Sequence, residues 1–185
     1  MTWQERWLSA VNLPNLVTLI RISLVPLFVL LYRRNPDPTV MNLPAALVFV
    51  LASATDALDG YLARTRREIT RFGQLIDPIA DKLLIAAALL VLVEARQVNT
   101  WVALIILGRE FAVSGLRILA AAEGKVIAAS LWGKIKTVSQ VVAVMAFFLG
   151  ISWAPVLMWL AVVATILSGV RYFQKAQDVL KSSME

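Results

Sequence analysis

The clearest chemical feature of the sequence is a cluster of aspartates, since four of the six in the chain fall within residues 56–81. They are Asp56, Asp59, Asp77 and Asp81. A helix turns about 100° per residue. Asp56 and Asp59, spaced i, i+3, therefore share one helix face, and Asp77 and Asp81, spaced i, i+4, share another. Four carboxylates in one pocket would repel one another unless cations neutralised them, and Mg²⁺ or Mn²⁺ accept such oxygen ligands. The cluster predicts a two-metal site of the kind that serves phosphoryl displacement. The alternative is a set of Asp–Lys/Arg pairs that hold the helices together.

The sequence also excludes several kinds of chemistry, because it contains no histidine and no cysteine. Ser-His-Asp and Cys-His nucleophilic sites, thiolate or imidazole zinc sites and disulfides all need one of these residues. Any catalysis therefore depends on carboxylates, lysine, arginine, hydroxyls and the backbone.

Composition predicts an integral membrane protein. The chain has 185 residues, 59% hydrophobic and 16% charged, with a mean hydropathy of +0.75, whereas a soluble domain has about 25% charged residues. Six stretches reach the roughly 20 residues that a transmembrane helix needs: 13–32, 41–63, 75–96, 99–121, 126–149 and 153–172. They leave no room for a separate soluble domain, so residues 1–185 are predicted to be one all-α membrane domain. Residues 1–12, with Trp3 and Trp7, suit a short interfacial helix.

Lysines and arginines at or beyond the ends of these stretches predict how the chain is oriented. With both termini inside, the inner segments carry nine of these residues and the outer segments three. The inner ones are Arg6, Arg64, Arg66, Arg67, Arg71, Lys125, Arg171, Lys175 and Lys181, and the outer ones are Arg33, Arg34 and Arg96. Since positive residues accumulate on the cytoplasmic side, both termini are predicted to be cytoplasmic. The net charge of +6 then reflects topology and attraction to anionic lipid, and no nucleic-acid partner is expected.

Apart from Glu94, Arg96 and Arg171, which lie close to span ends, eleven charged residues fall inside the predicted spans. They are Arg21, Lys82, Arg109, Arg117, Lys134, Lys136, Glu110 and the four clustered aspartates. A charge at the bilayer centre costs at least about 2.5–3.5 kcal/mol, so such residues usually face a polar cavity or a partner. With the N-terminus inside, nearly all of them map to the cytoplasmic half, as do Asn15 and Thr18. The sequence therefore predicts one polar pocket that opens toward the cytoplasm.

The aspartates belong to a longer pattern that resembles the signature of the CDP-alcohol phosphotransferases. The pattern is Asp56-x2-Asp59-Gly60-x2-Ala63-Arg64-x8-Gly73-x3-Asp77-x3-Asp81, and every fixed position is matched. Residues 12–21, 108–111 and 133–137 look like parts of the bacterial members of this family that make phosphatidylglycerol phosphate. The resemblance thus extends over most of the chain.

This resemblance implies an activity. Members of the family transfer a phosphatidyl group from CDP-diacylglycerol to an alcohol and release CMP. They act at the inner face of the membrane, which for the bacterial members is the cytoplasmic membrane. They share a six-helix fold, are commonly dimeric and need Mg²⁺ or Mn²⁺. A homodimer in membrane lipid is accordingly expected.

The match also assigns roles to residues. Asp56, Asp59 and Asp77 would bind metal, and Asp81 would be the general base with a share in metal binding. The donor nucleotide would be bound by Asn15, Thr18, Gly60, Ala63, Arg64, Thr70 and Gly73. Among these, Arg64 and Thr70 would contact the diphosphate. Gly60, Ala63 and Gly73 would leave space for the nucleotide.

The remaining cations inside the spans indicate an acceptor that carries a phosphate, because phosphate recognition needs positive donors. They are Arg109, Arg117, Lys134 and Lys136. In an ideal helix Lys134 and Lys136 are about 200° apart, so they cannot both point directly at one site. Any single cation could instead pair with Glu110 or snorkel to the membrane surface. Glycerol 3-phosphate is the acceptor that the resemblance implies.

Three other functions remain open at this point. The same transfer could use inositol phosphate or phosphatidylglycerol as the acceptor. A small cation transporter could use the aspartate cluster as its ion site. A purely structural membrane scaffold would leave the aspartates unexplained.

Overall fold

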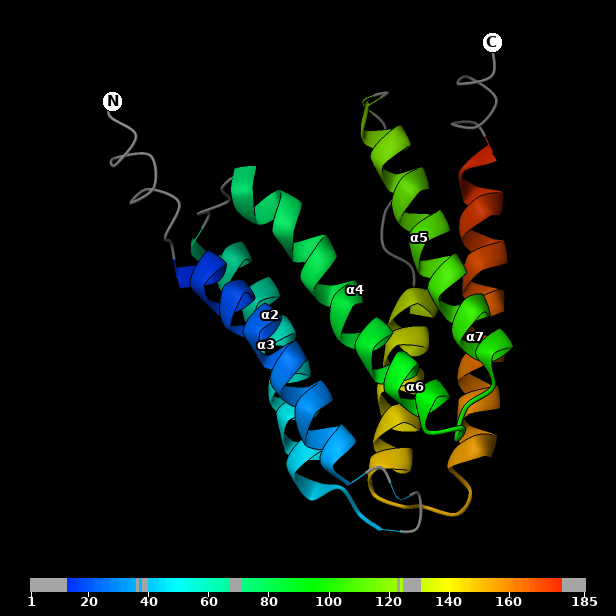
Figure 1. Ribbon diagram of the computed structural model, residues 1–185. Helices are drawn as coiled ribbons and strands as arrows, with labels where there is room; N and C mark the ends of the chain where they lie inside the picture. The colour runs from blue at the N-terminus through cyan, green and yellow to red at the C-terminus, as the bar shows by residue number, and fades with distance from the viewer. Residues whose placement is uncertain are drawn as a thin grey trace. The chain divides into compact units, whose positions relative to one another are not determined.

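The computed structural model describes residues 13–35, 37, 40–66, 71–122, 124 and 131–177, without the side chains of residues 13–15, 56–66, 71–75, 77, 78 and 81. The residues described form six α-helices and no strand (Figure 1). The helices are α2 (Leu13–Arg34), α3 (Leu43–Arg66), α4 (Arg71–Glu94), α5 (Thr100–Ala122), α6 (Leu131–Phe148) and α7 (Ala154–Lys175). The predicted all-helical fold is thereby confirmed.

Each predicted span coincides with one of these helices. The largest difference among the helix ends that can be compared is in α4, which is already helical at Arg71, four residues before the expected start at 75. The prediction followed the apolar run, whereas helical backbone continues through polar residues as long as its hydrogen bonds are made. The expected start of the fifth span, residue 126, and the interfacial segment 1–12 lie outside the described residues.

The chain divides into two compact units, Met1–Val91 and Leu92–Glu185. In the first unit, α2 packs along α3 and runs in the opposite direction (Figure 1). The aromatic rings of Phe28 and Phe49 lie 5.8 Å apart in this contact, and both side chains are buried. Ala45 and Ala52 of α3 are fully buried, and small side chains of this kind let two helices approach closely within a membrane.

Asn42 connects the end of α2 to the start of α3. Its amide nitrogen donates to the carbonyl oxygens of Tyr32 at 3.3 Å and Asn35 at 2.8 Å. Its Oδ1 accepts a hydrogen bond from the backbone N–H of Ala45 at 3.3 Å. These groups are the ones that a helix end leaves without an internal partner. One buried side chain therefore terminates one helix and caps the next, which fixes their antiparallel arrangement.

In the second unit, α7 packs against both α5 and α6 (Figure 1). Helices α6 and α7 are joined by a tight turn at Gly150, whose φ of +65° lies in the left-handed region that favours glycine. Near the other end of this pair, the guanidinium of Arg171 lies 4.2 Å from the ring centroid of Trp132. Polar side chains are buried between these helices, and they include Thr165 and Ser168 of α7.

The outer surfaces of the helices are strongly apolar. Each helix exposes large hydrophobic side chains, such as Leu30 in α2, Ile118 in α5 and Leu131 in α6. In the part of the chain that the structure describes, three helical segments are long and apolar enough to cross a membrane: Leu16–Arg34, Leu131–Phe148 and Ala154–Lys175. Helix α5 is also apolar, but it carries three charged residues, Arg109, Glu110 and Arg117. An all-helical chain with so much exposed apolar surface is typical of a membrane protein.

Candidate functional site

The residues expected to bind the donor nucleotide and the metals belong to the first unit. Helix α3 contains Asp56, Asp59, Gly60, Ala63 and Arg64, helix α4 contains Gly73, Asp77 and Asp81, and Asn15 lies in α2. Their side chains, and Thr70 as a whole, lie outside what the structure describes. The backbone of α3 and α4 is helical at these positions, so Asp56 and Asp59 keep their spacing within α3, and Asp77 and Asp81 keep theirs within α4.

Thr18 is the one predicted donor-site residue whose side chain the structure describes. It is buried in α2, as is Arg21 one turn later, and only 1% of each residue is exposed. Nε of Arg21 lies 3.4 Å from Oγ1 of Thr55 in α3, a long hydrogen bond. Thr55 directly precedes Asp56 in the sequence. A buried guanidinium is therefore held beside the segment in which the aspartate pattern begins.

The second unit brings two of the expected acceptor cations onto one carboxylate. Nζ of Lys136 in α6 lies 2.5 Å from Oε1 of Glu110 in α5. Nη1 of Arg109 lies 3.5 Å from the same oxygen. The side chains of Lys136, Glu110 and Arg109 are only 8%, 9% and 12% exposed. We call these three residues the Glu110 cluster; the sequence had identified Glu110 only as an alternative partner for a cation.

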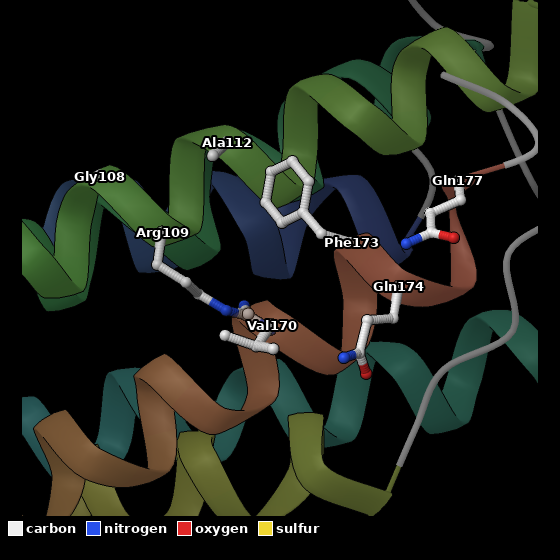
Figure 2. A pocket seen from close by; sticks show the side chains of 8 residues that line it. Gly108, Arg109, Ala112, Val170, Phe173, Gln174 and Gln177 are labelled. Atoms are coloured by element: carbon white, nitrogen blue, oxygen red, sulfur yellow. The ribbon is translucent and has the colours of Figure 1, made fainter. Parts of the chain in front are cut away.

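Arg109 has further contacts on α7. Its Nη2 donates a hydrogen bond of 2.7 Å to the hydroxyl oxygen of Ser168. Its Nε is buried and has no hydrogen-bond partner among the described residues. Figure 2 shows the side chain extending from α5 toward α7, where it reaches Val170. An open groove of about 570 Å³ lies here, lined by Gly108, Arg109, Ala112, Gly169, Val170, Phe173, Gln174 and Gln177.

Arg117, two turns after Arg109 in α5, also contacts α7. Its Nε donates to the phenol oxygen of Tyr172 at 2.9 Å, and its guanidinium carbon lies 5.7 Å from the centre of that ring. Most of α7 is apolar, so Ser168 and Tyr172 stand out as polar partners for the arginines of α5. Ser168 and Tyr172 could not be recognised as partners from the sequence, because they are uncharged and only the fold shows which residues they contact.

Lys134 differs from Lys136. Lys136 is buried, whereas Lys134 is exposed and lines another groove with Ile135 and Leu157. The two lysines thus lie on different faces of α6, as the helical spacing predicts. On the same side as Lys136, Gln140 is buried, and its amide donates to Thr165 of α7 at 2.9 Å.

Comparisons with known proteins identify relatives along nearly the whole chain. The sequence model of a family described as CDP-alcohol phosphatidyltransferase matches residues 11–167. A Bacillus subtilis protein is 41% identical over 93% of this chain and 98% of its own length. A Rickettsia bellii protein is 37% identical over 88% and 94%, and a Haemophilus influenzae protein 36% identical over 94% and 98%. All three bear the name CDP-diacylglycerol–glycerol-3-phosphate 3-phosphatidyltransferase.

Proposed function

Because the chain belongs to the CDP-alcohol phosphatidyltransferase family, we propose that it transfers the phosphatidyl group of CDP-diacylglycerol to sn-glycerol 3-phosphate. The products are phosphatidylglycerol phosphate and CMP. The names of relatives at 36–41% identity over most of the chain support this reaction. The structural observation that carries the choice of acceptor is Arg109, a buried cation with an unused donor.

The unused donor of Arg109 calls for an anion. A buried N–H without a hydrogen bond is costly, and a ligand oxygen would satisfy it. Arg109 and Lys136 provide two positive charges and Glu110 one negative charge, so the Glu110 cluster has a net charge of +1. A phosphate monoester carries about −1.5 to −2 at pH 7 and is therefore attracted to this cluster. In this proposal Arg109 and Lys136 bind the phosphate of glycerol 3-phosphate.

Arg117 and Lys134 complete the predicted acceptor set in different ways. Arg117 is eight residues after Arg109, about 12 Å along the helix axis, and is exposed. It attracts the acceptor at the predicted cytoplasmic end of α5. Lys134 is exposed on another face of α6, so its contribution is long-range attraction of the anion, which ionic strength weakens.

The donor and the metals are assigned to the first unit. The predicted ligands are all carboxylates, which suits Mg²⁺ or Mn²⁺, and α3 and α4 supply two each. Asp56, Asp59 and Asp77, with a share from Asp81, would hold two ions. When bound, these ions would lower the charge on the diphosphate and help CMP to leave.

The other predicted donor residues bind the nucleotide in this proposal. Arg64 and Thr70 hold the diphosphate, and Asn15 and Thr18 complete the nucleotide pocket. The small residues Gly60, Ala63 and Gly73 admit the nucleotide.

The chemical step is a displacement at phosphorus. The Asp81 carboxylate accepts the proton of an acceptor hydroxyl, and that oxygen attacks the phosphorus that bears diacylglycerol. A new oxygen–phosphorus bond forms while the bond from this phosphorus to the bridging oxygen of CMP breaks. CMP leaves with the bonding electron pair.

The membrane arrangement is part of the same proposal. All six helices cross the bilayer and residues 1–12 lie along its inner surface. Both termini are cytoplasmic, and the active site opens to the cytoplasm at the bacterial inner membrane. Residues 1–185 form one catalytic membrane domain, and the enzyme acts as a homodimer. The excess of basic residues in the inner segments and the apolar surfaces of the helices support this topology.

An acceptor competition tests the proposed substrate. Purified protein in mixed micelles with CDP-diacylglycerol and Mg²⁺ receives glycerol 3-phosphate, inositol phosphate and phosphatidylglycerol together in equal amounts. A different one of the three acceptors is radiolabelled in each reaction. We expect labelled glycerol 3-phosphate to give a labelled lipid product. Labelled inositol phosphate should give no labelled lipid, and labelled phosphatidylglycerol should not be converted into a new lipid. A lipid product from inositol phosphate or phosphatidylglycerol, with none from glycerol 3-phosphate, would overturn the choice of acceptor.

A further inference from the structure

One face of α7 contacts the arginines of α5 through neutral side chains. Thr165, Ser168, Gly169 and Tyr172 are spaced i, i+3, i+4 and i+7, so they share a helix face. All four are buried, and Thr165 and Ser168 are fully so. We call these residues the polar face of α7. Within a helix that is otherwise apolar, their contacts indicate what they do.

Ser168 orients Arg109 without cancelling its charge. Its hydroxyl oxygen accepts the 2.7 Å hydrogen bond from Nη2 of Arg109. A carboxylate at this position would hold the guanidinium equally well but would neutralise it. A neutral partner leaves the positive charge available to an anionic ligand, and it fixes the plane of the guanidinium in which Nε lies.

Gly169 makes room for the same side chain. A Cβ atom at position 169 would lie 3.2 Å from Cγ of Arg109 and 3.9 Å from its Nε. The first distance is shorter than an ordinary van der Waals contact, so a Cβ atom here would make the side chain of Arg109 shift by a few tenths of an ångström. In Figure 2 the arginine extends across to α7 at this level, beside Val170.

Tyr172 repeats the arrangement one turn later. Its phenol oxygen accepts a 2.9 Å hydrogen bond from Nε of Arg117, and its ring lies 5.7 Å from the guanidinium carbon. Again the partner is neutral, and again the arginine comes from α5. The same face of α7 thus positions two arginines in succession.

From these contacts we propose that Ser168, Gly169 and Tyr172 are positioning residues for acceptor binding. They set the guanidinium groups of Arg109 and Arg117 for an anionic acceptor. This inference rests on the proposed function, in which Arg109 binds the phosphate of the acceptor and Arg117 attracts the acceptor. The residues act through the arginines, so they should affect acceptor affinity and leave use of CDP-diacylglycerol unchanged.

Steady-state CMP release by the full-length protein in mixed micelles with Mg²⁺ tests the inference. Glycerol 3-phosphate is varied at saturating CDP-diacylglycerol, and then the donor is varied at saturating acceptor. We expect Ser168→Ala and Gly169→Ala to raise the KM for glycerol 3-phosphate about fivefold or more, the scale of a lost charge-assisted hydrogen bond. The kcat and the KM for CDP-diacylglycerol should stay within about twofold of wild type. Tyr172→Phe, which keeps the ring, should give a smaller shift in the same direction.

Gly115→Ala is the matched control, because a Cβ there would have no atom within 4 Å among the contacts described. It should leave both KM values within about twofold of wild type, as surface substitutions away from special features usually do. If Ser168→Ala and Gly169→Ala leave the acceptor KM unchanged, or raise both KM values together, the positioning role is wrong. Should one of the two fail to fold, the other gives the same readout.

A double substitution separates this inference from the proposed function. Once Arg109→Gln has removed the guanidinium, adding Ser168→Ala should raise the acceptor KM no further, since coupled residues are not additive. A second rise by the same factor would mean that Ser168 acts independently of Arg109, which overturns the inference. If Arg109→Gln raises the acceptor KM and the α7 variants do not, only the positioning role fails. If Arg109→Gln itself has no effect on that KM, the proposed acceptor site fails and the positioning role with it.

Discussion

Lys136 and Glu110 form a buried ion pair that joins α6 to α5, with Nζ of the lysine 2.5 Å from Oε1 of the glutamate. The pair is not isolated, because Arg109 lies 3.5 Å from the same oxygen. One carboxylate therefore serves two cations and leaves the cluster with net positive charge. Such an excess of charge is costly in an apolar surrounding. We interpret the net positive charge of the Glu110 cluster as a preorganised binding site for an anionic substrate.

The first prediction concerns the stability of the Glu110 cluster. Glu110→Gln leaves Lys136 and Arg109 buried without their shared carboxylate, and we expect a loss of about 3–5 kcal/mol in the free energy of unfolding. Adding Lys136→Met removes one of these two positive charges and should recover part of the lost stability. Titration with a denaturing detergent, followed by circular dichroism, measures both. A Glu110→Gln variant as stable as wild type would contradict the role of the pair.

The second prediction uses two lysines on one helix. Lys136→Gln should raise the KM for glycerol 3-phosphate at least about tenfold, because a charge-assisted hydrogen bond to phosphate is lost. Lys134→Gln removes the same charge from the exposed face of α6 and should change that KM by no more than about twofold at physiological ionic strength. Equal effects of the two substitutions would mean that the distinction between the two faces has no functional meaning.

The third prediction concerns the proposed base. Asp81→Asn keeps the size of the side chain but cannot accept the proton, so kcat should fall by about 10²–10⁴-fold. Binding of CDP-diacylglycerol, measured by calorimetry in micelles, should change little. Asp37→Asn, in the connection between α2 and α3, is the control and should retain full activity. Near-normal turnover by the Asp81 variant would rule out its role as the base.

The fourth prediction concerns the metals. Chelation should abolish CMP release, and Mg²⁺ or Mn²⁺ should restore it. Because a ligand that binds the folded state stabilises it, Mg²⁺ should also raise the Tm of the protein even without substrate. Asp56→Asn should lose most of that rise, whereas Asp37→Asn should keep it. Activity that persists after exhaustive chelation, or an equal rise in Tm for the Asp56 variant, would contradict the metal assignment.

The fifth prediction concerns topology, and the absence of cysteine from the chain makes it simple to test. A single cysteine introduced by Asn35→Cys or Trp153→Cys should react with a membrane-impermeant maleimide added to intact cells. One introduced by Glu185→Cys should react only after the membrane is opened. Both positions 35 and 153 are exposed in connections between helices, so accessibility should depend on the side of the membrane. The reverse labelling pattern would invert the proposed orientation.

Much of the fold could be predicted because it follows from the distribution of apolar residues along the sequence. In a bilayer, a run of about 20 apolar residues must pair its backbone N–H and C=O groups internally, which an α-helix does. Each such run in this chain coincides with a helix. The divergence of Lys134 and Lys136 could be predicted too, because it follows from helical spacing alone. The structure accordingly buries Lys136 and exposes Lys134.

Partners between helices were harder to predict, because they depend on how the helices pack. Glu110 had several cations as candidate partners, and only the packing of α5 with α6 and α7 selects Lys136 and adjacent Arg109. Ser168, Gly169 and Tyr172 carry no charge that would mark them in a sequence. The available signal was the helical spacing of small and polar residues along an apolar helix. Such spacing also suits simple helix packing.

The most direct measurement of the central claim is the stoichiometry of the reaction with purified protein. Released CMP and newly formed phosphatidylglycerol phosphate are quantified together, the latter by mass spectrometry, with CDP-diacylglycerol, glycerol 3-phosphate and Mg²⁺ present or omitted in turn. We expect one CMP for each phosphatidylglycerol phosphate, and neither product when any of the three is left out. The proposed transfer would be contradicted by CMP release that does not depend on glycerol 3-phosphate. It would also be contradicted if no phosphatidylglycerol phosphate formed when all three components are present.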